Sequence, residues 1–265
     1  MSVPVAVTIA GSDSGGGAGI QADLKTFSAL GVYGASVITA LTAQNTKGVF
    51  AIHQVPAEFI GAQMDAVFSD LDVGAVKIGM LGNTAAIEAI AAGLARHPGR
   101  NVVLDPVMTA TSGEELLRPD AVDALRKLAG RAALLTPNLP EAAALLGVPA
   151  ARDEDEMHAQ GRKLLELGAG AVLIKGGHGG GSDSVDLLVE PAGFTRFAGR
   201  RVKTDNTHGT GCTLAAAIAA GLAKDCMLGE AVGEAKTYVG AAIAAADRLK
   251  IGSGRGPLHH FHKWW

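Results

Sequence analysis

Short apolar runs alternate with longer Ala- and Leu-rich segments along most of the chain. This alternation is typical of βαβ units, in which parallel strands form a sheet and helices pack against it. We therefore predict an α/β fold with a mostly parallel central sheet flanked by helices, in three α/β/α layers. The strands predicted for the body of the sheet are Val3–Ala10, Gly34–Leu41, Ala75–Ile78, Asn101–Leu104, Ala132–Leu135 and Ala171–Ile174.

Helical spacing of apolar residues is clearest in Ala57–Phe68, which should pack one face on the sheet. The stretch from Gly11 to Gly19 is too rich in glycine for regular structure, so we predict a loop there. Val185–Val189 and Phe194–Phe197 are separated by Glu-Pro-Ala-Gly, which predicts an antiparallel hairpin at the edge of the sheet. The other predicted helices are Ile20–Leu30, Thr213–Leu222 and Ala231–Leu249.

The 265 residues can fill a single α/β domain, and no linker or repeat divides them. We therefore predict one domain over residues 1–250 and a C-terminal tail over residues 251–265. The net charge of −3, with no cluster of Lys and Arg, argues against a nucleic-acid partner. No apolar run approaches the ~20 residues that span a bilayer, and the start lacks the features of a signal peptide. We predict a cytoplasmic protein without membrane association.

The cysteines and the terminal histidines offer two further readings of the composition. Cys212 and Cys226 are too few for a disulfide framework and favour a reducing compartment. The tail carries His259, His260 and His262, which suit a metal site. A His-rich terminus beside Gly and Pro is more often flexible, and flexibility is the prediction that we prefer.

Four of the predicted strands are followed at once by residues that are not apolar. Gly79 follows one strand, Asp105 the next, Thr136 the third and Lys175 the fourth. In open α/β sheets, ligands bind beyond the carboxyl ends of the strands. The sequence therefore predicts that these residues converge on one crevice.

The segment from Gly209 to Thr213 leads from a polar turn into an apolar helix. Free backbone N–H groups at such a helix start attract anions, and the dipole favours a thiolate at Cys212. The alternatives are an ordinary tight turn and a Cys that only fills the core. No P-loop and no G-x-G-x-x-G spacing is present, so a nucleotide would be held differently. An anion site together with Lys175, Asp105 and Glu141 is what phosphoryl transfer requires.

Seven motifs occur in order along the chain: Thr8–Asp23, Val37–Thr46, Lys77–Leu81, Leu104–Met108, Thr136–Glu141, Lys175–His178 and Asn206–Thr213. Together they resemble the hydroxymethylpyrimidine and phosphomethylpyrimidine kinases of thiamine biosynthesis, which belong to the ribokinase superfamily. The resemblance runs from about Val3 to Ala245, which leaves the terminal tail outside it. It implies a ribokinase-like fold and a homodimer.

The resemblance implies a role for each candidate site residue. Gly209, Gly211 and Cys212 form the catalytic anion hole, in which Cys212 either deprotonates the substrate hydroxymethyl group or stabilises the charge that develops there. Gln44 and Asp23 bind the substrate ring, and Met80 and Val107 supply apolar walls. Lys175, Asn138 and Thr136 bind ATP, while Asp105 and Glu141 hold Mg²⁺, mostly through water. Thr109–Gly113 resembles the substrate lid, in which many members carry Lys where Thr111 stands, and Gly176–Ser182 should cover the nucleotide, with His178 left without a role.

Each of these residues also has a purely structural interpretation. Gln44 could bond the backbone at a strand end, and Asp23 could favour a helix dipole in a first turn. Asn138 and Glu141 have the spacing of a helix cap. Lys175 could be a surface residue, and Met80 could belong to the core.

We predict an ATP- and Mg²⁺-dependent kinase that phosphorylates 4-amino-5-hydroxymethyl-2-methylpyrimidine and then its monophosphate. A pyridoxal or pyridoxine kinase of the same superfamily is the nearest alternative. A pyrimidine sensor without catalysis is a more remote one.

Overall fold

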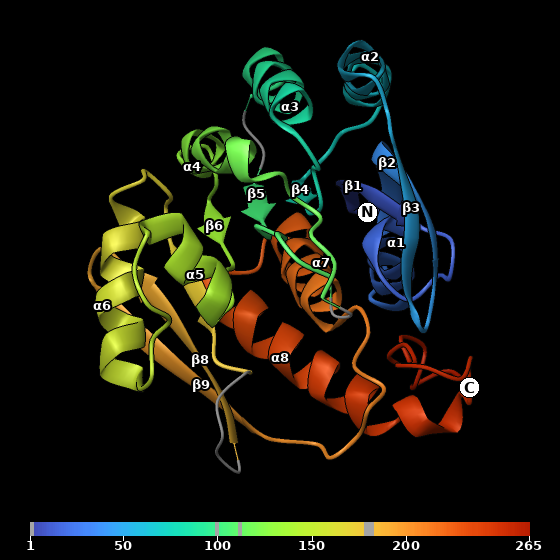
Figure 1. Cartoon of the computed structure of the whole chain (residues 1–265), viewed down its shortest axis with the longest axis vertical. Coiled ribbons are helices and arrows are strands. Elements are labelled where there is room, and N and C mark those ends of the chain that lie inside the picture. The colour runs from blue at the N-terminus through green and yellow to red at the C-terminus, as the bar shows by residue number, and fades with distance from the viewer. Residues whose placement is uncertain (1–2, 99–100, 111–112, 178–182) are drawn as a thin grey trace.

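The computed structural model describes residues 3–98, 101–110, 113–177 and 183–265. Within them, one sheet of nine strands runs in the order β3-β2-β1-β4-β5-β6-β7-β8-β9 (Figure 1). The strands from β2 to β7 are parallel, whereas β3 and β8 run antiparallel to their neighbours. The strands are β1 (Val5–Asp13), β2 (Tyr33–Asn45), β3 (Gly48–Gln54), β4 (Ala75–Ile78), β5 (Asn101–Leu104), β6 (Leu134–Leu135), β7 (Val172–Lys175), β8 (Asp183–Glu190) and β9 (Gly193–Arg200).

Helices cover both faces of this sheet. On one face α2 to α6 pack on Val7, Ile9 and Leu104, and on the other α1, α7 and α8 pack on Ala6 and Val103. Because both faces are buried, the central strands are continuously apolar, and the three predicted layers are confirmed. The helices are α1 (Gly19–Ala29), α2 (Ala57–Phe68), α3 (Thr84–Arg96), α4 (Val122–Ala129), α5 (Leu139–Leu146), α6 (Glu154–Leu165), α7 (Thr210–Ala223) and α8 (Leu228–Ala244), with 3₁₀ turns at Pro119–Ala121 and Ala246–Arg248.

Several predicted elements coincide with the structure. The bounds of α2, β4 and β5 are those predicted, and the hairpin of β8 and β9 closes one edge of the sheet. At the other edge the prediction falls short, because β2 continues to Asn45 and pairs with β3, which the sequence analysis did not predict. Gly11–Asp13, predicted as loop, belongs to β1, where Asp13 pairs with Thr42 of β2. Backbone pairing at these positions outweighs their polar, glycine-rich composition.

The prediction of a flexible C-terminal tail is wrong for its middle part. Leu258 is 1% exposed and His260 is 4% exposed. The Tyr238 hydroxyl donates to the His260 carbonyl at 2.8 Å, and Thr213 Oγ1 lies 3.0 Å from His260 Nε2. These contacts fix the segment against α7 and α8. The division of the chain at residue 250 stays a prediction.

Candidate active site

A buried ion pair lies beyond the carboxyl ends of β5 and β7. Lys175 Nζ lies 2.6 Å from Asp105 Oδ1, and the Thr136 hydroxyl donates to the same oxygen at 3.1 Å. Asp105 is 1% exposed and the Lys175 side chain 13% exposed, so the pair is largely shielded from solvent and only the lysine is partly exposed. Three predicted site residues from three strand ends are thus brought together. The interpretation of Lys175 as a surface residue is wrong.

Glu141 joins this group from the first turn of α5. Its carboxylate lies 3.8 Å from Lys175 Nζ and accepts the Asn138 N–H at 2.8 Å. Asn138 Oδ1 in turn accepts the Glu141 N–H, so the two residues form the capping box that their spacing allowed. Burial raises the pKa of Glu141 to about 7, although Lys175 opposes this shift. The cap and a role in binding therefore use the same side chain.

The N-terminus of α7 borders the ion pair. The helix begins at Thr210, three residues earlier than predicted, and follows Gly209, which has φ +83°. A Cβ on Gly209 would lie 2.0 Å from the Gly17 carbonyl oxygen. A Cβ on Gly211 would lie 3.4 Å from Lys175 Nζ and 3.6 Å from Asp105 Oδ2. Because glycine occupies both positions, the backbone of the first turn can approach Lys175 and Asp105 directly.

Cys212 lies in the same turn, and its thiol is less acidic than the sequence analysis predicted. Burial raises the pKa of the Cys212 thiol, which outweighs the opposing effects of the Lys77 ammonium and of the Gly19 N–H that bonds to it. The helix start alone suggested a thiolate. Cys212 is partly buried in the structure, and this burial, which the sequence does not show, raises the pKa rather than lowering it.

Lys77 and Asp23 form a second ion pair beneath the site. Their charged atoms lie 2.8 Å apart, both side chains are fully buried, and the Thr8 hydroxyl donates to Asp23 at 2.6 Å. Burial lowers the pKa of Lys77, but the negative charges of Asp23, Cys212 and Asp105 outweigh it and hold the pKa above its usual value. Sequence reasoning assigned no role to Lys77. A lysine within an otherwise apolar strand was the available signal.

Asp23 is the fifth residue of α1, so the interpretation that places it in the first turn for the helix dipole is wrong. Burial raises the pKa of Asp23, and Lys77 offsets part of this shift. With no exposed surface, the Asp23 side chain acts through Lys77 in this arrangement. Its contact with a substrate stays a prediction.

The predicted apolar walls lie near the strand ends. Met80 is 8% exposed, its carbonyl accepts the Thr39 hydroxyl at 2.7 Å, and its sulfur would lie 2.9 Å from a Cβ on Gly11. Val107 is half-buried and follows Asp105. Their contact with a substrate stays a prediction.

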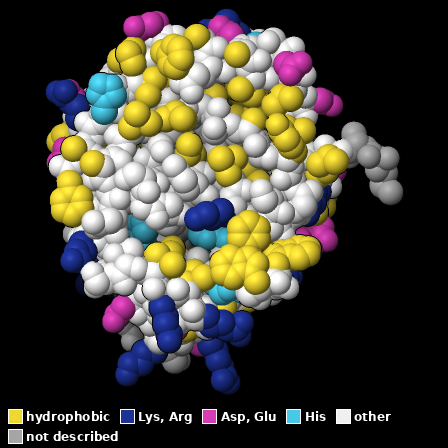
Figure 2. Space-filling model, turned by 90° about the vertical axis from the view of Figure 1, so that its right-hand side faces the viewer, with side chains coloured by type: hydrophobic (Ala, Val, Ile, Leu, Met, Phe, Trp, Pro, Cys, Tyr) yellow, Lys and Arg dark blue, Asp and Glu magenta, His cyan; other side chains and the backbone are white. Residues whose placement is uncertain are grey.

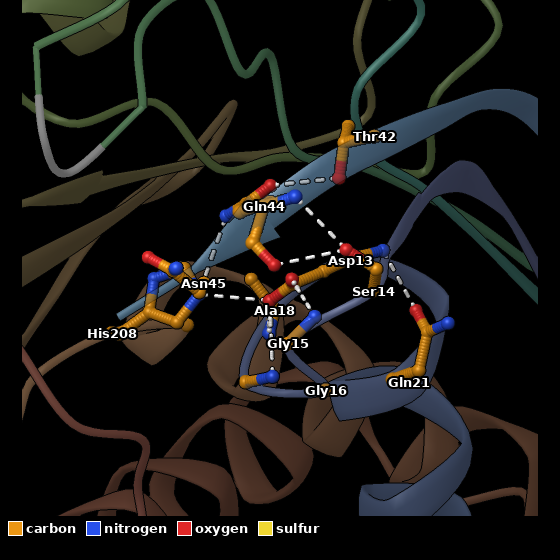
Figure 3. Close-up of polar contacts among 12 residues, drawn as sticks. Asp13, Ser14, Gly15, Gly16, Ala18, Gln21, Thr42, Gln44, Asn45 and His208 are labelled. Atoms are coloured by element: carbon orange, nitrogen blue, oxygen red, sulfur yellow. Dashed lines mark hydrogen bonds and ion pairs between the residues drawn. The ribbon is translucent and has the colours of Figure 1, made fainter. Parts of the chain in front are cut away.

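Gln44 lies near the end of β2 rather than beyond the strand, beside Asp13 and His208 (Figure 3). It borders a cavity of about 380 Å³ that is also lined by Lys47, His208 and Arg255. Figure 2 shows the face that carries β2, β3 and the C-terminus, where Lys, Arg and His side chains gather near apolar ones. Sequence reasoning gave no role to Asp13 or to His208, although both lie in motifs that it singled out.

Several predicted residues fall outside the described part of the chain. These are Thr111 and Ser112 of the predicted lid, and residues 178–182 of the predicted nucleotide loop, including His178. Among the residues that the structure does describe, no group of three or more His, Cys, Asp or Glu is placed to hold a metal ion. In the same described ranges, no helix has the length and apolarity to cross a membrane.

Comparison with known proteins tests the resemblance. The family model described as phosphomethylpyrimidine kinase matches residues 13–259. The chain belongs to the phosphomethylpyrimidine kinase family. The resemblance is thereby confirmed, and it extends into the segment that was predicted to lie outside it. As a family member, the chain is an ATP-dependent phosphotransferase.

Three known proteins resemble this chain over nearly its whole length. The chain is 62% identical to a hydroxymethylpyrimidine/phosphomethylpyrimidine kinase of Rhizobium meliloti, over 98% of both chains. It is 45% identical to a phosphomethylpyrimidine kinase structure from Clostridium difficile, with a TM-score of 0.81 over 90% of this chain and 99% of that one. It is 37% identical to an ADP complex of Bacillus subtilis pyridoxal kinase, with a TM-score of 0.90 over 98% of each chain. Similarity of fold alone therefore does not distinguish a phosphomethylpyrimidine kinase from a pyridoxal kinase.

Proposed function

We propose that this chain phosphorylates 4-amino-5-hydroxymethyl-2-methylpyrimidine and then its monophosphate, using MgATP. The high identity to a relative named for both activities supports the substrate. The observation that carries the proposal is the approach of the α7 N-terminus to Lys175 and Asp105 at Gly211. A helix start, an ammonium and a carboxylate at one point suit a phosphoryl group that passes between two oxygens.

Lys175 provides the mobile positive charge. Its ammonium pairs with Asp105 in the structure and can turn to an ATP phosphate oxygen, because it is a point charge on a flexible stem. Thr136 and Asn138, at the end of β6, complete the surroundings of the phosphates. Because Gly211 has no side chain, a phosphate can approach its backbone closely.

Asp105 and Glu141 fit a magnesium ion through the chemistry of their donors. Both are buried carboxylates within 4 Å of Lys175 Nζ, at 2.6 and 3.8 Å, and Mg²⁺ prefers few carboxylates together with water. Bound there, Mg²⁺ would neutralise phosphate charge. When Lys175 turns to a phosphate, the Asp105 carboxylate loses the positive charge that it pairs with. Its negative charge is then available to a cation.

Cys212 is proposed to take the proton of the substrate hydroxyl as the phosphoryl group transfers. Lys77 and the Gly19 N–H favour the thiolate that must first be present, whereas burial favours the thiol that forms afterwards. The fully buried Lys77–Asp23 pair holds this positive charge in place. The substrate ring is proposed to lie against Gln44, with Met80 and Val107 beside it.

We further propose that the protein is a cytoplasmic homodimer, which the family resemblance supports. Sedimentation equilibrium at micromolar concentration should then give twice the chain mass of 26.8 kDa. A concentration-independent mass of one chain would contradict the dimer.

Incubation of the purified protein with MgATP and the hydroxymethylpyrimidine, and with pyridoxal in parallel, tests the substrate. We expect mono- and diphosphorylated pyrimidine by mass spectrometry, with little pyridoxal phosphate. Monophosphate alone would contradict the second step, and pyridoxal phosphate as the main product would overturn the substrate while leaving the kinase in place. Omission of Mg²⁺, with EDTA present, should abolish both products.

A further inference from the structure

Asp13 and His208 form a hydrogen-bonded pair beside Gln44, 195 residues apart in the chain (Figure 3). The Asp13 carboxylate is 3% exposed and lies 2.8 Å from His208 Nε2. It also accepts backbone N–H groups from Gly15, Gly17 and Ala18 at 2.7 to 3.0 Å. The pair thus ties the glycine-rich loop after β1 to the residue that precedes Gly209.

Packing holds the His208 ring in one place. A Cβ on Gly17 would lie 2.4 Å from His208 Cδ2, so the ring rests directly on the loop backbone. The backbone N–H of His208 donates to the Gly256 carbonyl at 3.1 Å, which anchors the residue to the C-terminal segment. Only 14% of the side chain is exposed. His208 is therefore a fixed neighbour for Gln44.

The chemistry of Asp13 decides which nitrogen of His208 carries a proton. Burial alone would favour the neutral acid, but His208 and the backbone donors hold the pKa of Asp13 below its usual value. An ionised carboxylate only accepts hydrogen bonds, so His208 Nε2 must be the donor. This holds whether the ring is neutral or charged. Nε2 therefore has no lone pair for a second donor.

The Gln44 amide has to agree with this assignment. Its nitrogen lies 3.4 Å from His208 Nε2, and its oxygen lies 3.0 Å from Thr42 Oγ1. In that arrangement the NH₂ group of Gln44 points at the Nε2–H of His208, so two donors face each other. Thr42 has a single hydroxyl proton, and the Ser12 carbonyl lies within 3.0 Å to accept it. A half-turn of the amide exchanges its oxygen and nitrogen within the same shape. The amide N–H then donates to Thr42, and the amide oxygen faces the His208 Nε2–H, whose main acceptor remains Asp13 at 2.8 Å.

We propose that His208, held by Asp13, is a positioning residue that fixes the Gln44 amide with its oxygen toward His208 and its nitrogen toward Thr42. One N–H and one oxygen lone pair of the amide then remain for a ligand, in a fixed order. A ring fits that order when it carries an exocyclic amino group beside an unprotonated nitrogen, with the amino group on the His208 side. Pyridoxal lacks this amino group. This part of the inference rests on the proposed function.

The orientation is tested first in the protein without ligand. Side-chain ¹⁵N-labelled Gln44 should show nuclear Overhauser contacts from its NH₂ protons to Thr42 and none to the His208 ring. In His208→Leu the two orientations should interchange and the contact to Thr42 should weaken. Contacts to the His208 ring in the wild-type protein would overturn the proposal, whatever the enzyme acts on.

Kinetics then test the consequence. His208→Leu should raise the KM for the hydroxymethylpyrimidine roughly 10- to 100-fold and change kcat less than about threefold, because a polar pairing with the ring is lost. His208→Gln, which keeps an N–H near the position of Nε2, should restore most of the affinity. His53→Leu, at an exposed position of β3, is the matched control and should leave KM unchanged.

Other results separate this inference from the proposed function. A wild-type protein that does not phosphorylate the pyrimidine would contradict the proposed function, while the amide contacts would still decide the orientation. A loss of kcat at unchanged KM in His208→Leu, or a failure of His208→Gln to restore KM, would overturn the positioning role. If His208→Leu does not fold, Thr42→Val removes the acceptor on the other side of the amide, and an unchanged KM in that variant would equally overturn it.

Discussion

Two lysine–aspartate pairs lie near Cys212, and they differ in how far their side chains are exposed to solvent. Lys77 and Asp23 are both fully buried, at 2.8 Å. Lys175 and Asp105 are as close, at 2.6 Å, but the lysine is 13% exposed and faces Gly211 and Glu141. A fully enclosed pair cannot change partners. A pair whose lysine is partly exposed can release that lysine to a phosphate and its carboxylate to a cation.

From this difference in exposure we infer that the two ion pairs have different roles. Lys77 supplies a fixed positive charge near Cys212, and its loss would lower stability as well as make the Cys212 thiol less acidic. Lys175 supplies a charge that moves, and its loss would be felt mainly as lost catalysis.

Lys77→Met should lower the free energy of unfolding by about 3–5 kcal/mol, because it leaves the Asp23 carboxylate buried without its partner. Urea denaturation at pH 7 measures the change. The double variant Lys77→Met with Asp23→Asn should recover a large part of the loss, since the stranded charge is gone. A single variant as stable as the wild-type protein would contradict the structural role of the pair.

Lys175→Met should lower kcat/KM roughly 10²- to 10³-fold, as expected for the loss of one group that stabilises developing charge. Its loss of unfolding free energy should be smaller than that of Lys77→Met, because the Lys175 side chain is 13% exposed and water can enter at the place of the lost ammonium. Lys127→Met, at an exposed position of α4, serves as the control and should keep full activity. Near-normal turnover in Lys175→Met would remove the distinction between the two pairs.

Glu141 should make stability depend on pH. Its pKa is raised from 4.5 to about 7 by burial, so the folded state holds a proton that the unfolded state releases. Stability from this group is full below about pH 4.5 and is lost as pH rises to about 7, by on the order of 3 kcal/mol. Denaturation at pH 5 and pH 7.5 should show this fall in the wild-type protein and a smaller fall in Glu141→Gln. Parallel pH profiles would contradict a buried, neutral Glu141.

The exposed pair of Arg152 and Glu156 should show the smallest effect. These side chains are 84% and 35% exposed, and surface ion pairs are screened by water and salt. Glu156→Gln should leave the denaturation midpoint unchanged in 0.15 M salt. A shift comparable to that of Lys77→Met would show that burial does not decide the strength of ion pairs in this protein.

Periodicity predicted the middle of the fold well. Strands β4 and β5 and helix α2 have the predicted bounds because their burial leaves a clear apolar signal. Strand β3 was missed because an edge strand is exposed on most positions and its polar residues resemble a loop. The buried segment at Leu258 was missed because a short terminal run carries no periodicity.

The candidate site was predicted as far as strand ends and motifs reach. Asp105, Thr136 and Lys175 converge because parallel strands end at one edge. Lys77 and His208 were not given roles, since their partners lie 54 and 195 residues away. The acidity of Cys212 was misjudged because the helix start is visible in sequence and burial is not.

The role of Cys212 is the central claim, and Cys212→Ala tests it most directly when turnover and binding are measured on the same preparation. The account predicts that kcat for the hydroxymethylpyrimidine falls roughly 10²- to 10⁴-fold, the range for the loss of a general base. The dissociation constant of the pyrimidine should change less than about threefold, because Gln44 and the apolar walls remain. A kcat within a few-fold of the wild-type value would contradict the account.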